Sequence, residues 1–214
     1  MEVIRNIVRE EEEVQETSTP ETYDSAEIAC LVEWAASDHI EAFGELYAIY
    51  LDRIYRYVFY QVNDKMTAED LVQDIFLKAW KSLNSYNKKR ASFSTWLYRI
   101  AHNHVIDYFR TRRPHQTLED DIQDSATSLE EDAEKLLMQK ELSETISGLP
   151  PQQRQIIILK FIEGLDNQEI AQIMGKREGA IRVMQMRALR NLRQKLTRDG
   201  SICGLNNIKS LMNA

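Results

Sequence analysis

Apolar residues recur at intervals of three and four along most of the chain, a spacing that places them on one face of an α-helix. From residue 25 to residue 62 the pattern predicts two helices separated near Ser37 and Asp38. A third helix is predicted over residues 67–83, and a fourth over residues 94–113 after the loop 85–93. The first half of the chain is therefore expected to be a bundle of helices.

The second half shows helix signals of the same kind. Ser128 and Glu131 have the spacing of a capping box, for a helix that extends to about residue 147 before Gly148. The proline pair 150–151 begins another helix, because proline is tolerated in a first turn, and Gly164 ends it.

A short helix, a turn and a longer helix follow. Asp166 and Glu169 form a second capping box, Gly175 closes the short helix, and the longer helix begins near Arg177. This order is typical of a helix-turn-helix. In the longer helix a buried face is expected from Ile181, Met184, Ala188 and Leu192. The residues left outward or flanking are Arg182, Val183, Met186, Arg187, Arg190 and Arg193. Such a basic face suits phosphate neutralisation, although a merely solvated helix is the alternative.

Composition supports an all-α protein, because 214 residues include only seven glycines and four prolines. Cys30 and Cys203 lack the spacing of a zinc site or a disulfide framework. The N-terminus does not resemble a signal peptide, and no apolar run is long enough to cross a membrane. We therefore expect a cytoplasmic protein without membrane insertion.

The formal charge of −7 is unevenly distributed. Residues 1–40 carry −9, residues 41–113 carry +4, residues 114–148 carry −8 and residues 149–214 carry +6. This division predicts two small helical domains, 25–113 and 135–199, joined by a flexible acidic linker, 114–134. A disordered acidic tail, 1–24, precedes them and a short tail, 200–214, follows. The acidic segments are either simple tethers or mimics of nucleic acid that cover the basic surfaces.

The loop 85–93 and the helix after it interleave cations with aromatic residues. They include Lys88, Lys89, Arg90, Phe93, Trp96, Tyr98, Arg99, Tyr108 and Arg110. This mixture suits single-stranded nucleic acid, with cations on phosphates and a lined pocket for a flipped base, although Phe93 and Trp96 equally suit a core. His102, His104 and Asp107 are too divergent on a helix for a metal site, and no catalytic constellation or cofactor motif is present.

The helix over residues 67–83 has two distinct sides. Leu71, Ile75 and Trp80 are expected to face inward, and the residues off that face are Asp70, Gln73, Asp74 and Leu77. Either this is an ordinary amphipathic bundle helix or its outer side docks on a partner helix.

These stretches resemble bacterial RNA polymerase sigma factors of the extracytoplasmic-function class, within the sigma-70 family. The sequences AFGELYAIYLDRIYRYV, AEDLVQDIFLKAWKSL and FSTWLYRIAHNHVIDYFRTRR resemble successive parts of region 2. The sequence LPPQQRQIIILKFIEGLDNQEIAQIMGKREGAIRVMQMRALRNLRQKL resembles region 4. The resemblance covers roughly residues 26–113 and 135–196.

The resemblance implies a non-enzymatic specificity subunit that binds core RNA polymerase and directs transcription initiation and strand opening. Its implied partners are the clamp helices and flap of the polymerase, promoter DNA and an anti-sigma factor, with no cofactor and no metal. The implied polymerase-binding residues are Asp70, Leu71, Gln73, Asp74, Phe76 and Leu77. Those implied for the −10 element are Lys88, Lys89, Arg90, Ser92, Phe93 and Asn103. Those implied for the −35 element are Arg177, Arg182, Val183, Met186, Arg187 and Arg190.

The chain departs from the family pattern at residues 177–181. Where the family often has Ser or Pro followed by Glu-Gly-Thr-Val, this chain has Arg-Glu-Gly-Ala-Ile, which removes a helix cap and a hydroxyl. A free-standing helix-turn-helix regulator is the alternative function, but it leaves the outward residues between Asp70 and Phe76 unexplained.

Overall fold

The structure is a computed structural model and describes residues 23–111 and 143–198. Every regular element within these ranges is helical, which confirms the all-α prediction. The predicted linker, the C-terminal tail and the first part of the helix predicted from Ser128 lie outside the described residues, as does the predicted N-terminal tail up to residue 22. Residues 143–147, at the end of that helix, are helical.

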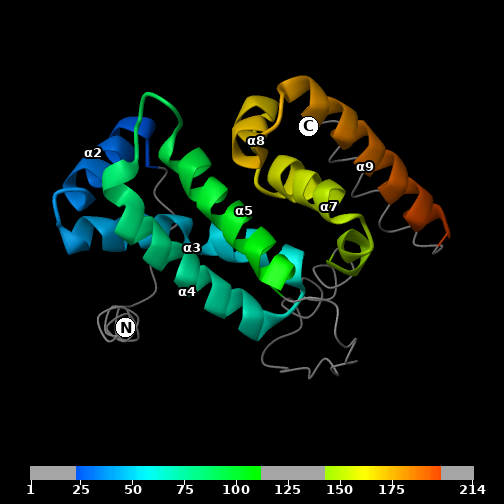
Figure 1. The fold of residues 1–214 in the computed structure, drawn as a ribbon, viewed down its shortest axis with the longest axis horizontal. Helices are drawn as coiled ribbons and strands as arrows, with labels where there is room; N and C mark the ends of the chain where they lie inside the picture. The colour runs from blue at the N-terminus through cyan, green and yellow to red at the C-terminus, as the bar shows by residue number, and fades with distance from the viewer. Residues whose placement is uncertain (1–22, 112–142, 199–214) are drawn as a thin grey trace.

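The N-terminal unit, residues 23–111, contains the helices predicted for it (Figure 1). They are α2 (Ser25–Ala35), α3 (Ile40–Val62), α4 (Lys65–Ser82) and α5 (Phe93–Thr111), with a 3₁₀ turn, η2, at Leu83–Ser85. The break between α2 and α3 lies where it was predicted, and Asp38 there has a left-handed φ of 64°. Aspartate tolerates this conformation better than most residues, because its short side chain can hydrogen-bond locally.

The first helix begins at Ser25, where the predicted domain begins, but its N-cap residue lies inside the predicted acidic tail. The Asp24 carboxylate accepts a 2.8 Å hydrogen bond from the Glu27 amide, and the Glu27 carboxylate accepts one of 2.7 Å from the Asp24 amide. This reciprocal pair is a capping box. Asp24 therefore belongs to α2 and not to the tail predicted over residues 1–24.

The C-terminal unit, residues 143–198, contains α7 (Pro151–Ile157), α8 (Asn167–Met174) and α9 (Glu178–Arg198). The predicted helix before Gly164 is wound as a π-helix, η3, over its last part (Ile158–Ile162). Gly164 and Gly175 have φ of 72° and 62°, a conformation that costs glycine little, and they end the helices as predicted.

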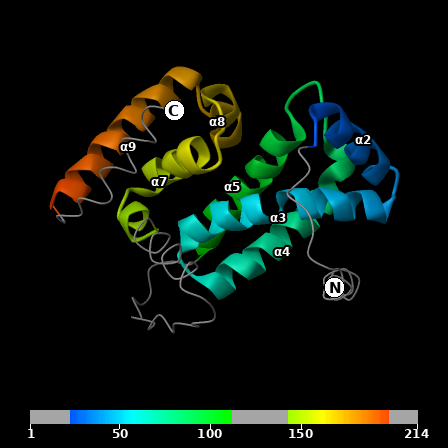
Figure 2. The same cartoon turned by 180° about the vertical axis from the view of Figure 1, so that it is seen from behind.

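The two units pack directly against each other. Helix α8 contacts α5, while η3 and α7 contact α3. Their buried apolar side chains form one continuous cluster. Figures 1 and 2 show α9 on the side of the C-terminal unit that faces away from α2, α3 and α4. Within the described residues, no helix is both long and apolar enough to cross a membrane.

Candidate nucleic-acid interface

Helix α9 has a buried side and a basic exposed side. Ile181, Ala188 and Leu192 are at most 3% exposed and Met184 is half-buried, as the spacing predicted. The opposite side exposes Arg177, Arg182, Val183, Met186, Arg187, Arg190 and Arg193. Val183 and Met186 are 48% and 65% exposed and lie three residues apart, so they place an apolar pair within this basic side.

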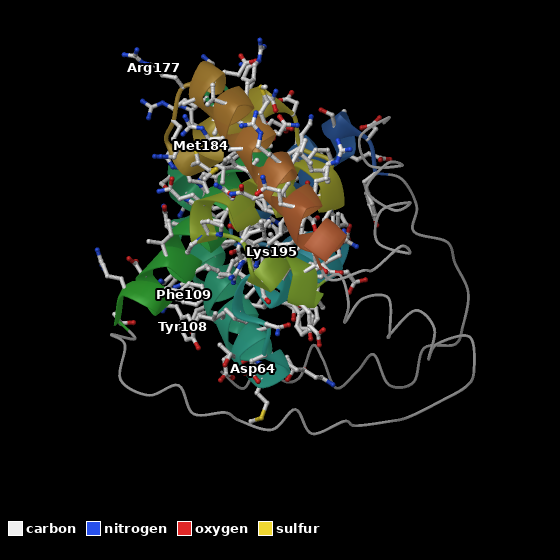
Figure 3. The ribbon with its side chains drawn as sticks, turned by 90° about the vertical axis from the view of Figure 1, so that its right-hand side faces the viewer. Asp64, Tyr108, Phe109, Arg177, Met184 and Lys195 are labelled. Atoms are coloured by element: carbon white, nitrogen blue, oxygen red, sulfur yellow. The ribbon has the colours of Figure 1, made fainter. Side chains whose placement is uncertain are left out.

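The helix-turn-helix geometry rests on local hydrogen bonds. The Asp166 carboxylate accepts from the Glu169 amide at 2.8 Å, and the Glu169 carboxylate accepts from the Asp166 amide at 2.9 Å, which confirms the predicted capping box. After the turn at Gly175, the Arg177 carbonyl accepts from the amides of Ala180 and Ile181. Figure 3 shows Arg177 projecting from the body of the protein at the start of α9.

Arg182 has an acidic neighbour one turn earlier in α9. Its guanidinium donates to the Glu178 carboxylate at 2.5 Å, and the two side chains are 67% and 44% exposed. Glu178 lies in the first turn, where the positive end of the helix dipole stabilises an acid. Arg182 must therefore break its ion pair with Glu178 before its guanidinium can bind DNA.

The loop between η2 and α5 presents its cations over an aromatic cluster. Lys88, Lys89, Arg90 and Ser92 are exposed, and Lys88 pairs with Glu33 at 2.5 Å. Beneath them the rings of Tyr86, Trp96 and Tyr50 surround Phe93, with centroids 5.4–5.8 Å from its ring. Phe93 is 4% exposed and therefore belongs to the core, so of the predicted −10 residues it is the one unable to contact DNA as the domain is folded.

Asn103 is exposed on α5, where Arg99 and Arg110 are exposed as well. Residues four and seven apart share one side of a helix. The exposed side of α5 therefore combines a neutral hydrogen-bonding group with cations.

Ser92 has a second role, because its hydroxyl accepts a hydrogen bond from the Thr95 amide at 3.1 Å at the start of α5.

The predicted polymerase-binding residues of α4 divide between surface and core. Asp70, Gln73 and Asp74 are exposed and Leu77 is half-buried. Leu71 and Phe76 are 6% and 3% exposed, and the Phe76 ring lies 4.6 Å from that of Tyr47. Those two side chains hold α4 in the bundle, so a docking surface can include only the other four.

Asp74 also faces α5. Its carboxylate lies 3.5 Å from His104 Nε2, and Lys78 Nζ lies 2.5 Å from His104 Nδ1. Burial, followed by the Lys78 charge, lowers the pKa of His104. The imidazole therefore bridges α4 and α5 in its neutral form at neutral pH.

His102 and His104 contact different residues. His102 is buried, with Nδ1 3.5 Å from the Tyr57 hydroxyl, and burial lowers its pKa to about 4. In the part of the chain that the structure describes, no group of three or more His, Cys, Asp or Glu side chains is arranged to hold a metal ion.

Four charged residues missed by the sequence analysis join the two units: Arg53, Arg56, Arg154 and Glu163. Little in the sequence indicates that these residues lie between the units, because single charged residues within apolar helices usually lie at the surface.

Comparison with known proteins assigns both units to families. Residues 46–115 match the model of Sigma-70 region 2, and residues 139–192 match that of Sigma-70, region 4. The chain is 37% identical to the ECF RNA polymerase sigma factor BldN of Streptomyces coelicolor over 180 residues, covering 82% of this chain and 68% of BldN.

A second relative is the ECF RNA polymerase sigma factor SigW of Bacillus subtilis, at 32% identity over 171 residues, covering 73% of this chain and 89% of SigW. Among solved structures, CnrH in complex with the cytosolic domain of CnrY is similar, with a TM-score of 0.65 and 26% identity. That similarity covers 82% of this chain and 99% of CnrH.

Proposed function

Because the chain belongs to the extracytoplasmic-function RNA polymerase sigma factors, we propose that it directs core polymerase to promoters through three separate surfaces. The exposed side of α4 binds polymerase. The loop 88–92 and Asn103 bind the −10 element and assist strand opening. The exposed side of α9 binds the −35 element.

The observation that carries this proposal is the exposed side of α9. Its arginines supply the charge that phosphates require, and Arg182, Val183 and Met186 lie in the first turns, which enter the major groove when a recognition helix docks. Val183 and Met186 offer apolar contact, which suits a thymine methyl group. The preferred −35 sequence is therefore expected to contain thymine opposite these residues.

The proposed polymerase surface consists of Asp70, Gln73, Asp74 and Leu77. Two carboxylates beside a half-buried leucine suit a partner helix with basic and apolar residues. A free-standing regulator has no need for such a surface, so its presence favours a polymerase subunit.

An anti-sigma factor is the further protein partner that we propose. CnrH, which resembles this chain over most of its length, is known in complex with another protein. Exposed apolar side chains such as Trp34, 58% exposed, and Phe109, 47% exposed, are available for such a contact.

Transcription in vitro separates the two candidate functions. Core polymerase is incubated with a promoter library, with and without the protein, and transcripts are sequenced. A sigma factor yields new transcripts whose start sites share −10 and −35 sequences. A free-standing regulator yields transcripts only if another sigma factor is present, and that result would overturn the proposal.

A further inference from the structure

A histidine from α5 contacts two opposite charges on the exposed side of α4. Asp74 and Lys78 are four residues apart on α4, and both are exposed. Opposite charges at this spacing on a helix can pair directly. Among residues 23–111 and 143–198, however, no ion pair joins Asp74 to Lys78. Instead the His104 ring reaches both, with Nδ1 2.5 Å from Lys78 Nζ and Nε2 3.5 Å from the Asp74 carboxylate.

The lysine determines which nitrogen of the ring carries the proton. An ammonium group can only donate hydrogen bonds, so Nδ1 of His104 accepts from Lys78 and the proton of the neutral ring lies on Nε2. That nitrogen is shielded from water and has no hydrogen-bond partner among the described residues. A shielded N–H without a partner is costly, and the Asp74 carboxylate is the anion that faces it. The ring therefore attracts Lys78 at one nitrogen and Asp74 at the other.

The ring is buried, whereas the carboxylate beside it is open to solvent. The His104 side chain is 13% exposed and that of Asp74 is 62% exposed. The charged groups that act on the ring are Lys78 and Asp74 of α4 and Asp107 of α5, and Asp107 pairs with Arg110 at 3.0 Å. Burial lowers the pKa of His104, the Lys78 charge lowers it further, and the two carboxylates oppose this change. A neutral ring, which can accept from Lys78, is thus fixed beside an exposed acid.

We propose that His104 is a positioning residue for polymerase binding: its ring holds Lys78 by a hydrogen bond and so keeps that cation from neutralising the Asp74 carboxylate, which stays available to the polymerase. The inference rests on the proposed function, in which Asp74 belongs to the polymerase surface. A hydrogen bond to a charged group contributes more to stability than an exposed ion pair does, so Lys78 favours the ring over Asp74. A carboxylate already paired within its own helix would offer less attraction to a basic partner.

The test measures the affinity of the full chain for immobilised core polymerase by surface plasmon resonance. The parent is compared with His104→Ala, Lys78→Met and the double variant that carries both changes. His104→Gln is a conservative variant, because its amide oxygen can still accept from Lys78. His39→Gln is the matched control, since it removes another histidine of the same unit, whose Nδ1 lies 3.2 Å from the Trp34 carbonyl and not on α4.

His104→Ala should weaken binding roughly threefold to tenfold, between the value of an exposed ion pair and that of a charge pair buried at an interface. The loss is expected because Lys78, released from the ring, pairs with Asp74. In the Lys78→Met background the same alanine substitution should have little effect, since no cation remains there to neutralise the carboxylate. His104→Gln should bind more tightly than His104→Ala, and His39→Gln should bind like the parent.

Two results would overturn the positioning role. One is parental affinity in His104→Ala. The other is an equal loss on His104→Ala in the parent and in the Lys78→Met background, because a ring that serves only as packing is missed equally in both. Circular dichroism of each variant checks that the helices are retained, so that a loss of affinity is not a loss of fold.

Asp74→Asn distinguishes a failure of this inference from a failure of the proposed function. If Asp74→Asn weakens binding while His104→Ala does not, the polymerase surface stands and His104 does not position it. If Asp74→Asn binds core polymerase as tightly as the parent, α4 does not present this carboxylate to the polymerase, and the proposed surface is itself wrong.

Discussion

Replacing Arg182 with alanine tests the recognition helix most directly. Arg182 is the exposed arginine nearest the start of the helix proper, and its guanidinium is held by Glu178. We expect Arg182→Ala to relax selection at one −35 position while leaving the other positions unchanged. Arg190→Ala, about two turns later on α9 and also exposed, should weaken binding to all sequences alike.

The magnitude follows from two opposing terms. A bidentate contact between arginine and guanine discriminates by about 1–3 kcal/mol. The exposed pair with Glu178, which must be given up, is worth about 0.2–1 kcal/mol. The net loss is therefore about 1.5 kcal/mol, or roughly tenfold in relative affinity. Glu178→Gln should do the reverse, because it frees Arg182 and removes an anion that repels phosphate.

The assay is selection from a promoter library with randomised −35 positions, using each variant bound to core polymerase. Binding of the preferred sequence is then titrated with salt. Arg190→Ala should lower the slope of log affinity against log salt by about 0.9, the value for one lost phosphate contact. If Arg182→Ala and Arg190→Ala both retained the parental −35 selection, α9 would not be the recognition helix.

Three further predictions concern other parts of the molecule. Asp74→Arg should weaken binding to core polymerase in a pull-down, whereas Glu45→Arg, the same charge change at an exposed position of α3, should not. The pKa of His102 falls from 6.5 to about 4 on folding, so the free energy of unfolding should rise by about 3 kcal/mol between pH 4 and pH 6.5 and then level off. His102→Gln should remove that part of the rise in urea denaturation. Deleting residues 1–22 removes seven acidic and two basic residues, so the free protein should bind promoter DNA more tightly at low salt, and the gain should fade as salt increases.

Each of these predictions has a clear contrary result. Equal recovery of polymerase with the parent and Asp74→Arg would exclude α4 as the docking surface. A denaturation profile of His102→Gln parallel to that of the parent over the whole pH range would show that His102 gains no proton on unfolding. Equal DNA affinity of the full and shortened chains at low salt would show that the tail does not cover the DNA-binding surfaces. The deletion stops before Asp24 because that residue caps α2.

Helix boundaries were predictable because they are encoded locally. Asp166 and Glu169 form a capping box from residues three apart, and Gly175 ends α8 in a conformation that costs glycine little. The buried side of α9 was equally predictable, because helical periodicity alone places Ile181 and Ala188 together. The fold class and the helix-turn-helix follow from such signals.

Burial of individual site residues was less predictable. Leu71 faces inward as predicted, but Phe76, five positions later on α4, is buried as well, because α4 is covered by α3 on one side and α5 on another. Periodicity gives the direction of a helix face but not its width. Phe93 illustrates the same limit, since an aromatic residue beside a basic loop fits a base pocket and a core equally well until its neighbours are known.

The contact between the units depends on information that no local pattern contains. Glu163 lies 107 positions from Arg56 and 65 positions from Tyr98 in sequence, and none of the three carries a local signal of this contact. Charge counting divided the chain into two basic units joined by an acidic linker, but it carried no information on whether the units touch. The structure shows how they adhere nonetheless: apolar side chains of both units join in one core, and one acidic residue of the more basic unit is enclosed by two arginines of the other. The net charge of a domain governs its electrostatic interactions at long range, and salt screens these. Contact between two domains depends on interactions over a few ångströms, where the attraction of one carboxylate to a neighbouring arginine is stronger than the repulsion between distant cations.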